Sequence, residues 1–236
     1  MNYKIGIDYG GTKIEGILIN DKGEEILRKR SGYEKNYESG VDTIKNLVEE
    51  FDKHTNSKNS VGIGIPGSSS KENGLIKNAN SIWLNGKPFK KDLEMSLDRE
   101  IKIMNDANCF ALSEAIDGSG ANYNTVWGVI IGSGFGGSFV HNKKVVEGVN
   151  QVAGDWGHQP LPYPRKEEWD LNLKCPVDNC GRPLCAEQFI SGIGFTNIFN
   201  RKYKTNFTTK EIVDLELNGD ERAKKEFDLY EDRFAR

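Results

Sequence analysis

Apolar residues in the first part of the chain follow the spacing of strands and then of a helix. Residues 4–8 and 14–19 are short β-rich runs joined by YGGTK, and EEILRKR extends them into a third strand, which predicts a meander. Residues 41–54 carry apolar side chains at helical spacing, and VGIGIPG (61–67) predicts a buried strand after that helix. A strand, a helix and a further strand in this order indicate a sheet with a right-handed crossover.

The same alternation continues along the chain. Residues 92–100 predict a helix, 101–106 a strand and the Ala-rich run 107–116 a helix directly after it. The polar, Gly-rich DGSGANYN that follows predicts a boundary between two α/β lobes, residues 1–118 and 119–236.

A second copy of the opening strand and turn is predicted in the second lobe. The alignment pairs Ile5 with Ile131, Gly6 with Gly132, Gly10 with Gly136, Gly11 with Gly137 and Thr12 with Ser138. Two lobes that each open with a strand, a Gly-rich turn and a strand indicate a duplicated α/β fold with both turns facing one cleft. A cleft between lobes suits a ligand that must be enclosed away from water.

The charge composition of the chain indicates which kind of binding partner to expect. The 236 residues include 32 Lys and Arg against 35 Asp and Glu, a net charge of −3, so no basic surface for nucleic acid is expected. The start has no leader pattern, and the longest apolar run, Val126–Ile131, is far shorter than the roughly 18 residues of a membrane span. We therefore expect a cytoplasmic protein with a small neutral or anionic partner. The final run, KKEFDLYEDRFAR, predicts a helix without a C-cap signal, which leads us to expect a C-terminally truncated chain.

Two Gly-rich turns are candidates for holding phosphate. In DYGGTK (8–13), glycines let the backbone approach an anion, Thr12 and Lys13 add a hydroxyl and a charge, and Asp8 could hold Mg²⁺ through water. A hairpin turn that merely needs glycine explains this stretch alone equally well. GSGFGG (132–137) opens no helix and is no dinucleotide fingerprint, but two turns in matching strand contexts favour a triphosphate held from both lobes. The candidate phosphate-binding residues are Asp8, Gly10, Gly11, Thr12, Lys13, Gly132, Ser133, Gly134, Gly136 and Gly137.

Asp106 lies where a predicted strand meets a helix. A carboxylate at the C-terminal end of a strand can accept a proton from a substrate hydroxyl, as a general base in phosphoryl transfer does. The local sequence supports equally a second interpretation, in which Asp106 only caps the helix that follows.

Three of the four cysteines lie close together at Cys175, Cys180 and Cys185. Intervals of five residues are wider than a CxxC knuckle, so the spacing is moderately specific for zinc, and His158 is the histidine best placed to complete a closed structural site. A group of free thiols or a labile disulfide remains the alternative.

With these motifs in place, the chain resembles the ROK family of bacterial sugar kinases over essentially its whole length. IGIDYGGTK resembles the first phosphate motif of that family, GSGFGG the second, NDANCFALSEA the catalytic segment, and AGDWGH with CGRPLCAEQFISGIGF the signature and zinc motif. IPGS, KNANSIWLNGKPF and GHQPLP are most similar to the fructokinase (mannofructokinase) branch, with the N-acetylglucosamine kinases next.

The resemblance implies an actin-like, hexokinase-like (ribonuclease H-like) fold of two lobes in which MgATP phosphorylates a hexose hydroxyl. Fructose is the favoured substrate, N-acetylglucosamine, glucose and mannose are alternatives, and a homodimer is compatible with the family. Asp106 would be the general base. The sugar pocket would contain Gly67, Asn80, Asn105, Asp106, Asp155, His158 and Glu187, and structural Zn²⁺ would be bound by His158, Cys175, Cys180 and Cys185.

Three features depart from the family pattern. Asp155 stands where the family usually has glutamate, and the interval between Cys175 and Cys180 is longer. Leu184 replaces a glycine, so a side chain there opposes the backbone bend that glycine allows. Family members also continue beyond this C-terminus. Two alternatives to a kinase therefore remain, a non-catalytic sugar-binding fragment and a regulatory relative. A winged helix, which a repressor of the family would carry, is not seen before the first strand. The cysteine cluster disfavours acetate-type kinases and actin-like ATPases.

Overall fold

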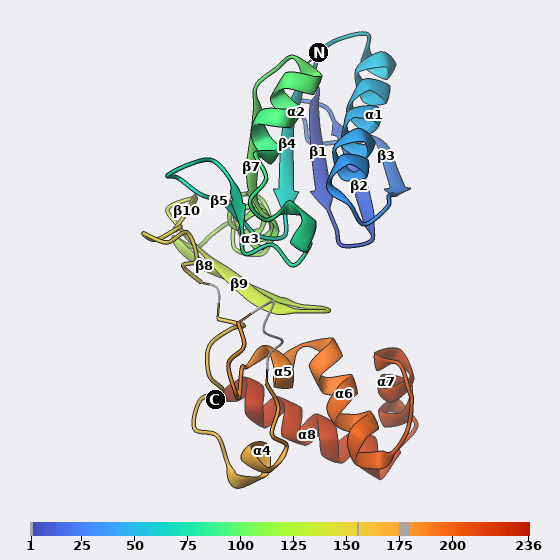
Figure 1. The fold of residues 1–236 in the computed structure, drawn as a ribbon, viewed down its shortest axis with the longest axis vertical. Coiled ribbons are helices and arrows are strands. Elements are labelled where there is room, and N and C mark those ends of the chain that lie inside the picture. Colours follow the sequence, from blue (N-terminus) through green and yellow to red (C-terminus); the bar gives the residue numbers. More distant parts are fainter. Residues whose placement is uncertain (1, 155, 175–179) are drawn as a thin grey trace. The chain divides into compact units, whose positions relative to one another are not determined.

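The computed structural model describes residues 2–154, 156–174 and 180–236 (Figure 1). The chain divides into two compact units between Phe110 and Ala111, inside helix α3 (Asp106–Ile116). The lobe boundary predicted after residue 118 lies just beyond the end of this helix and stays a prediction.

The first unit is built on a five-stranded sheet in the order β3-β2-β1-β4-β7. Its strands are β1 (Lys4–Tyr9), β2 (Lys13–Ile19), β3 (Glu25–Gly32), β4 (Ser60–Ile65) and β7 (Ile101–Asn105). β1 pairs antiparallel with β2 and parallel with β4, which itself pairs parallel with β7. The predicted meander and the later strands are thereby confirmed, and the C-terminal ends of β1, β4 and β7 meet at one edge of the sheet.

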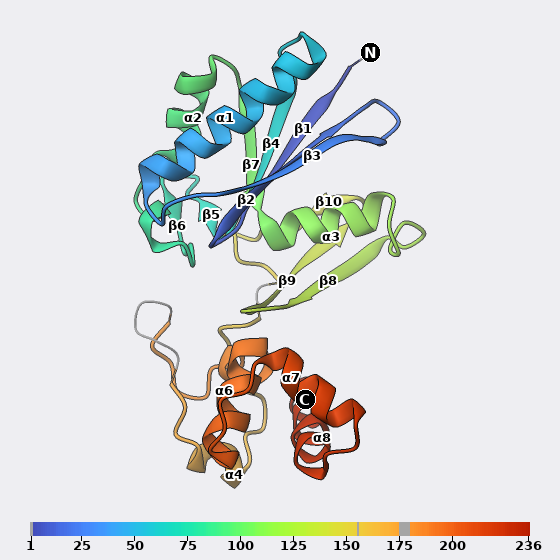
Figure 2. The same cartoon turned by 90° about the vertical axis from the view of Figure 1, so that its right-hand side faces the viewer.

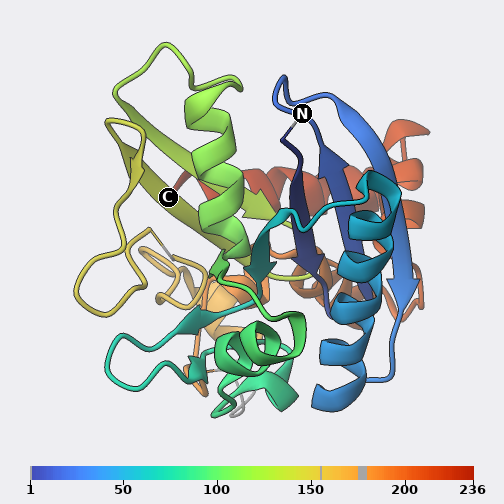
Figure 3. The ribbon, with the colours of Figure 1, turned by 90° about the horizontal axis from the view of Figure 1, so that it is seen from above.

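Two helices, α1 (Tyr37–Thr55) and α2 (Phe89–Leu97), pack on this sheet (Figure 3). Apolar side chains recur on one side of α1 at helical spacing, and they are buried against the strands in one hydrophobic core. The helix predicted over 92–100 is α2, which ends earlier because Asp98 takes a left-handed conformation with φ of 50°. Between β4 and α2 lie the short strands β5 (Ser68–Ser69) and β6 (Ile76–Lys77) and the 3₁₀ turn η1 (Ile82–Leu84).

The second unit contains a three-stranded antiparallel sheet and a group of helices (Figure 2). The sheet has the order β10-β9-β8, and Ala111 and Ala115 of α3 are buried with Val140 of β9. Its elements are β8 (Thr125–Ile131), β9 (Phe135–His141), β10 (Lys144–Val145), α4 (Lys166–Asp170), α5 (Glu187–Ile190), α6 (Gly192–Tyr203), α7 (Thr209–Leu217) and α8 (Glu221–Ala235). In the part of the chain that the structure describes, no helix is both long enough and apolar enough to cross a membrane.

The internal repeat is real as a hairpin, but its predicted register is wrong. The first hairpin closes at the pair Tyr9 and Ile14, and the second closes at Ile131 and Phe135. The turn that corresponds to residues 10–13 is therefore 132–134. Gly136 and Gly137, which the alignment placed on Gly10 and Gly11, lie inside β9 opposite Ile130 and Val129.

The predicted final helix is confirmed as α8, and its last turn is held by a buried ion pair. Arg233 and Glu168 of α4 are 3% and 2% exposed, and their side chains lie 3.3 Å apart. Arg236 donates to the same carboxylate at 2.8 Å and to the Tyr163 carbonyl at 2.6 Å. Partial burial raises the pKa of Glu168, but the hydrogen bonds from Arg236 and its neighbours outweigh this, and the net pKa lies below its usual value.

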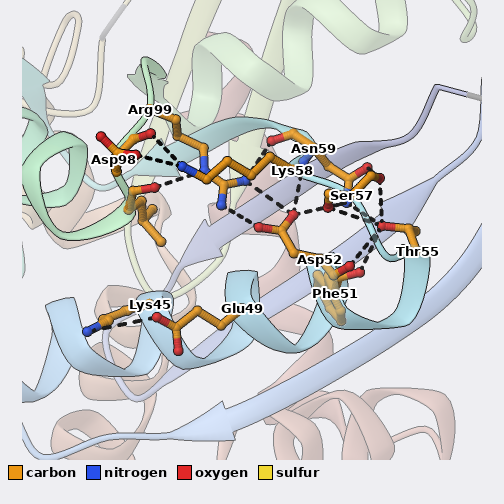
Figure 4. A network of polar contacts seen from close by, with 11 residues as sticks. Lys45, Glu49, Phe51, Asp52, Thr55, Ser57, Lys58, Asn59, Asp98 and Arg99 are labelled. Carbon is orange, nitrogen blue, oxygen red and sulfur yellow. Dashed lines mark hydrogen bonds and ion pairs between the residues drawn. The ribbon is translucent and has the colours of Figure 1, made fainter.

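A polar network joins the end of α1 to the turn before β7 (Figure 4). Arg99 pairs with the Asp52 carboxylate and donates to the Asn59 carbonyl at 2.9 Å, while the Asn59 amide donates to Asp52 at 2.9 Å. The side chains of Arg99 and Asp52 are only 12% and 15% exposed. Partial burial raises the pKa of Asp52, but the hydrogen bonds from Arg99 and Asn59 outweigh it, so the net pKa is lowered.

Replacement of Arg99 by methionine should therefore destabilise the first unit by about 2 kcal/mol at pH 7, because Asp52 loses its charged partner in a poorly solvated place. The pair stabilises the fold above the unfolded-state pKa of about 3.9 and loses this effect as pH falls through the lowered folded-state pKa. The difference between wild type and Arg99→Met in urea unfolding should thus shrink below about pH 4. Lys58→Met, which removes a pair whose partners are 59% and 95% exposed, should change the free energy of unfolding much less than Arg99→Met does. Equal costs for the two variants would contradict this account.

Candidate functional site

The turn after β1 is too tight for a side chain at its first position. The Gly10 amide donates to the Lys13 carbonyl at 3.0 Å, and a Cβ atom at Gly10 would lie 2.8 Å from that oxygen. Gly11, Thr12 and Lys13 are exposed, and Gly11 has open space around its Cα. The turn therefore presents backbone and side-chain donors outward, as an anion site requires.

Two carboxylates follow strands at the same sheet edge, Asp8 near the end of β1 and Asp106 directly after β7. Desolvation raises the pKa of Asp106 above its ordinary value, a hydrogen bond from the Ala107 amide opposes this, and the negative charge of Asp8 raises it further. Desolvation and the neighbouring Glu15 likewise raise the pKa of Asp8, with Arg30 acting against them. A buried carboxylate whose ionisation is further disfavoured by a second carboxylate is suited to accept a proton or to lie near a cation.

The capping role at α3 is carried out by Asn105. Its side-chain oxygen accepts the Asn108 amide at 3.1 Å, three residues on, which is the hydrogen bond of an N-cap. Asp106 accepts the Ala107 amide next to it, at 2.8 Å, which is not the hydrogen bond of an N-cap. The alternative in which Asp106 serves only as the cap therefore loses its support.

Gly67 and Asn80 come from neighbouring loops of the first unit. Gly67 has φ of 126°, and a Cβ atom there would lie 2.8 Å from the Ala79 Cα and from the Lys77 carbonyl. The side-chain amide of Asn85 holds Ala79 from both sides, since its oxygen accepts the Ala79 amide at 2.9 Å and its nitrogen donates to the Ala79 carbonyl at 3.0 Å. Asn80 is exposed directly after this fixed residue.

In the second unit, the turn 132–134 lies beside a cavity. The Gly132 carbonyl accepts the Gly192 amide at 2.8 Å, at the first turn of α6, and Ser191 caps that helix. A cavity of about 340 Å³ opens here. It is lined by Ile131, Gly132, Ser133, Gly192, Ile193, Phe195, Thr209, Val213, Phe227 and Tyr230. A mostly apolar cavity that adjoins a Gly-rich turn and a helix N-terminus can accept a planar group that carries phosphate.

His158, Cys180 and Cys185 lie together in this unit, with their candidate ligand atoms all within 4.8 Å of one another. The Cys180 and Cys185 sulfurs are 3.7 Å apart, and the Cys185 sulfur lies 3.6 Å from the His158 Nδ1. Tetrahedral zinc with Zn–S of about 2.3 Å and Zn–N of about 2.0 Å separates its ligand atoms by about 3.5–3.8 Å. The separation of the two sulfurs and that of the Cys185 sulfur from the His158 Nδ1 thus agree with those between ligands of one zinc ion.

The bend at Leu184 is made despite its side chain. Leu184 has φ of 52° and is buried in a hydrophobic cluster with Leu161 and Phe189. Its amide donates to the Leu173 carbonyl at 3.2 Å, and its own carbonyl accepts the Leu161 amide at 2.7 Å. Burial of the side chain and these two backbone bonds offset the strain of a left-handed non-glycine residue.

Glu187 is 9% exposed at the start of α5 and lies next to the His158 loop. Its carboxylate accepts the Phe135 amide at 3.2 Å, and its own amide donates to the Gly157 carbonyl at 2.8 Å. Asp155 and Cys175 fall outside the described residues, so their predicted roles stay predictions.

Sequence reasoning missed two residues that fix the loops of the first unit. Tyr33 donates its hydroxyl to the Gly10 carbonyl at 2.9 Å, and Asn85 holds Ala79. No local signal marked Tyr33, while Asn85, in the run LNGKP, could have been read as a turn residue with a side-chain hydrogen bond.

The structure has two units, each with a strand, a Gly-rich turn and a strand, and two carboxylates at the edge of a parallel sheet, and these features agree with the class of sugar phosphotransferases built from two such units. Residues 4–236 match the family described as the ROK family, and the chain belongs to this family. The chain is 38% identical over 232 residues to the N-acetyl-D-glucosamine kinase of Escherichia fergusonii, covering 98% of this chain and 76% of that protein.

Solved structures agree on the fold. A ROK family glucokinase from Streptomyces griseus, in complex with glucose and AMPPNP, matches with a TM-score of 0.77 and 24% identity, over 96% of this chain and 74% of that one. A ROK family transcriptional regulator, a homologue of the E. coli MLC protein, matches with a TM-score of 0.79 and 17% identity, over 97% of this chain and 59% of that one. The predicted hexokinase-like fold is thereby confirmed. The fructokinase branch gains no support, because the first relatives are N-acetylglucosamine kinases.

The contact below the His158 loop yields a prediction about the second unit. A Cβ atom at Gly157 would lie 1.7 Å from the Phe135 carbonyl oxygen, so Gly157→Ala must displace backbone. We expect a loss of about 2 kcal/mol in chemical unfolding. The matched control, Gly132→Ala, adds a methyl group where nothing lies within 4 Å and should change stability by less than about 1 kcal/mol. Indistinguishable unfolding curves for the two variants would contradict the packing described here.

Proposed function

We propose that this chain transfers the γ-phosphoryl group of ATP to a hydroxyl group of N-acetyl-D-glucosamine. Its family and its relatives support an ATP-dependent sugar kinase, and the relative at 38% identity supports this substrate. The observation that carries the catalytic part is Asp106, whose carboxylate stands at the sheet edge with the capping task left to Asn105.

Asp106 acts as the general base. It accepts the proton of the attacking hydroxyl while the sugar oxygen forms a bond to the γ-phosphorus and the bond from that phosphorus to the bridging oxygen breaks, releasing ADP. Its raised pKa brings it closer to working pH, which favours proton acceptance in the transition state. Asn105 orients this carboxylate, since its side chain bonds both Asp106 and the first turn of α3.

Phosphate is bound by the two Gly-rich turns. Gly10, Gly11, Thr12 and Lys13 supply donors from the first unit, and Gly132, Ser133 and Gly134 from the second. Gly136 and Gly137 follow this turn inside β9, which packs closely there, because a Cβ atom at Gly137 would lie 2.8 Å from the Gly128 carbonyl. The nucleoside of ATP occupies the cavity beside Gly132, against Ile193 and Tyr230.

Mg²⁺ is the expected companion of ATP, and Asp8 is the residue that would hold it through water. The unfavourable interaction of Asp8 with Asp106 and Glu15 fits a place where a cation is bound. A bound Mg²⁺ would neutralise charge on the phosphates.

Sugar hydroxyls are bound by exposed polar groups on fixed backbone. Asn80 follows Ala79, which Asn85 holds by two hydrogen bonds and against which Gly67 packs closely, and Asn105 adjoins the base. From the second unit, Glu187 and the Nε2 side of His158 contribute, since Nδ1 faces the Cys185 sulfur. Asp155 is proposed for the same pocket on the family resemblance alone.

A structural Zn²⁺ is proposed at His158, Cys180 and Cys185, with Cys175 as the fourth ligand. The spacing of the three described ligand atoms supports it. Bound there, the metal would fix the loop that carries His158 against the start of α5, where Glu187 lies. Homodimer formation and a cytoplasmic location stay predictions.

A sugar panel tests the proposed reaction on this chain. With MgATP, coupled ADP release should give a kcat/KM for N-acetylglucosamine that exceeds those for fructose, glucose and mannose by at least about tenfold. Asp106→Asn should lower kcat by about 10³-fold or more with the sugar KM nearly unchanged, because only proton acceptance is lost. Asp117→Asn, on the exposed side of the turn after α3, is the matched control. Fructose as the best substrate would reverse the assignment, and no turnover with any sugar would favour a regulatory or sugar-binding relative.

The zinc proposal makes a separate prediction. Wild type purified in buffer with trace zinc should hold about one ion per chain by mass spectrometry of the metal, and Cys180→Ser should hold far less. Cys109→Ser, a cysteine outside the cluster, should keep its zinc. Full zinc content in Cys180→Ser, or none in wild type, would refute the ligand set.

A further inference from the structure

Three aromatic side chains of the first unit connect the two loops that the proposed function uses. We call residues 10–13 the phosphate turn, residues 78–85 the sugar loop, and Tyr9, Tyr33 and Trp83 the aromatic link. The Trp83 Nε1 donates to the Tyr9 hydroxyl at 3.0 Å, and the Tyr33 hydroxyl donates to the Gly10 carbonyl at 2.9 Å. The rings of Tyr9 and Tyr33 meet edge to face at 5.2 Å, and those of Tyr33 and Trp83 at 6.2 Å.

Tyr9 sits in this link with little freedom to move. It is the last residue of β1, is 1% exposed, and packs edge to face on Phe89 at 5.6 Å. Its hydroxyl also lies against the backbone of α1, because a Cβ atom at Gly40 would be 2.3 Å from it. A displacement of Tyr9 is therefore passed directly to Gly10, the next residue, rather than absorbed by loose packing.

Trp83 also belongs to the sugar loop, which contains Asn80. It lies in η1, with Leu84 fully buried next to it and Asn85 holding the Ala79 backbone through two hydrogen bonds. Within residues 79–85, Asn85 therefore bonds Ala79, and Trp83 bonds Tyr9. A ligand that shifts Asn80 must act on the same segment that positions Tyr9.

We propose that the aromatic link is a positioning device that couples the sugar loop to the phosphate turn, so that a bound sugar improves binding of the nucleotide phosphates and the reverse. This inference rests on the proposed function, because it needs both ligands. The three residues are positioning residues, which act through Gly10 and Asn80. Coupling of this kind is reciprocal, and loss of one neutral hydrogen bond should change it by about two- to tenfold.

The same core offers a control for purely structural effects. The Tyr37 hydroxyl donates to the Asp92 carboxylate at 2.6 Å, and the Tyr37 ring packs on Phe89 as that of Tyr9 does. Tyr37→Phe therefore removes a comparable buried hydroxyl from the same aromatic cluster without a bond to either loop.

The experiment is titration calorimetry of MgAMPPNP on the full chain, with and without saturating N-acetylglucosamine. In wild type the sugar should tighten nucleotide binding, and the ratio of the two Kd values measures the coupling. Trp83→Phe and Tyr33→Phe should each reduce this ratio by about two- to tenfold, whereas Tyr37→Phe should leave it unchanged. Tyr33 is half-buried, and Tyr33→Phe removes only one oxygen atom. This variant is therefore expected to fold and can be measured even if Trp83→Phe does not fold.

The outcomes separate the two levels of inference. If both ligands bind and the ratio is the same in all variants, or Tyr37→Phe lowers it as much as the others, the aromatic link is overturned and the sugar kinase stands. If wild type binds both ligands without any coupling, the link is likewise overturned. If wild type binds neither ligand, the proposed function fails and the coupling fails with it.

Discussion

Close approach of backbone to backbone at three glycines is the constraint on which the candidate site depends. Gly10 closes the phosphate turn on the Lys13 carbonyl, Gly67 lies against Ala79, and Gly157 lies under the Phe135 carbonyl, each nearer than any side chain permits. At each of these glycines, a loop that carries a candidate functional group packs closely against the end of a strand. The strands therefore fix the positions of the polar groups on these loops. The strands themselves are held by packing in the hydrophobic core, so the loop positions do not depend on a ligand.

Charge at the sheet edge follows from this topology. Parallel pairing of β1, β4 and β7 brings Asp8 and Asp106 to one edge of the sheet. Desolvation raises the pKa of Asp106, and the negative charge of Asp8 raises it further. The Ala107 amide at Asp106 and Arg30 near Asp8 oppose this effect only in part, since the pKa of each carboxylate stays above its ordinary value. Asn105 caps the helix, so Asp106 is not needed for that role. The raised pKa values of Asp8 and Asp106 are therefore better explained by binding of a proton or a cation than by stability of the fold.

The sequence predicts the strands and helices of the first unit well, because each element has a clear period and the turns carry Gly, Pro or Asn. The register of the repeat could not be predicted in the same way. GSGFGG contains four glycines that could align with Gly10 and Gly11. Gly136 and Gly137 lie inside β9 rather than in the turn, and Gly137 packs closely on Gly128. Asp106 was ambiguous for a related reason. Only the hydrogen bond from the Asn108 amide to Asn105 assigns the cap, and no spacing rule distinguishes adjacent residues at a strand-to-helix junction.

The aromatic residues of the first unit illustrate a limit of a different kind. Tyr9, Tyr33 and Trp83 are separated by up to 74 positions along the chain and look, one by one, like ordinary core residues. What distinguishes them is the direction of a hydroxyl and an indole N–H, which is set by the surrounding fold and costs free energy if left unpaired. An apolar side chain of equal size would fill the same space. Their polar atoms are therefore explained by what they bind, namely the end of β1 and the carbonyl of Gly10, and this makes the backbone of the phosphate turn part of a network that also includes the sugar loop.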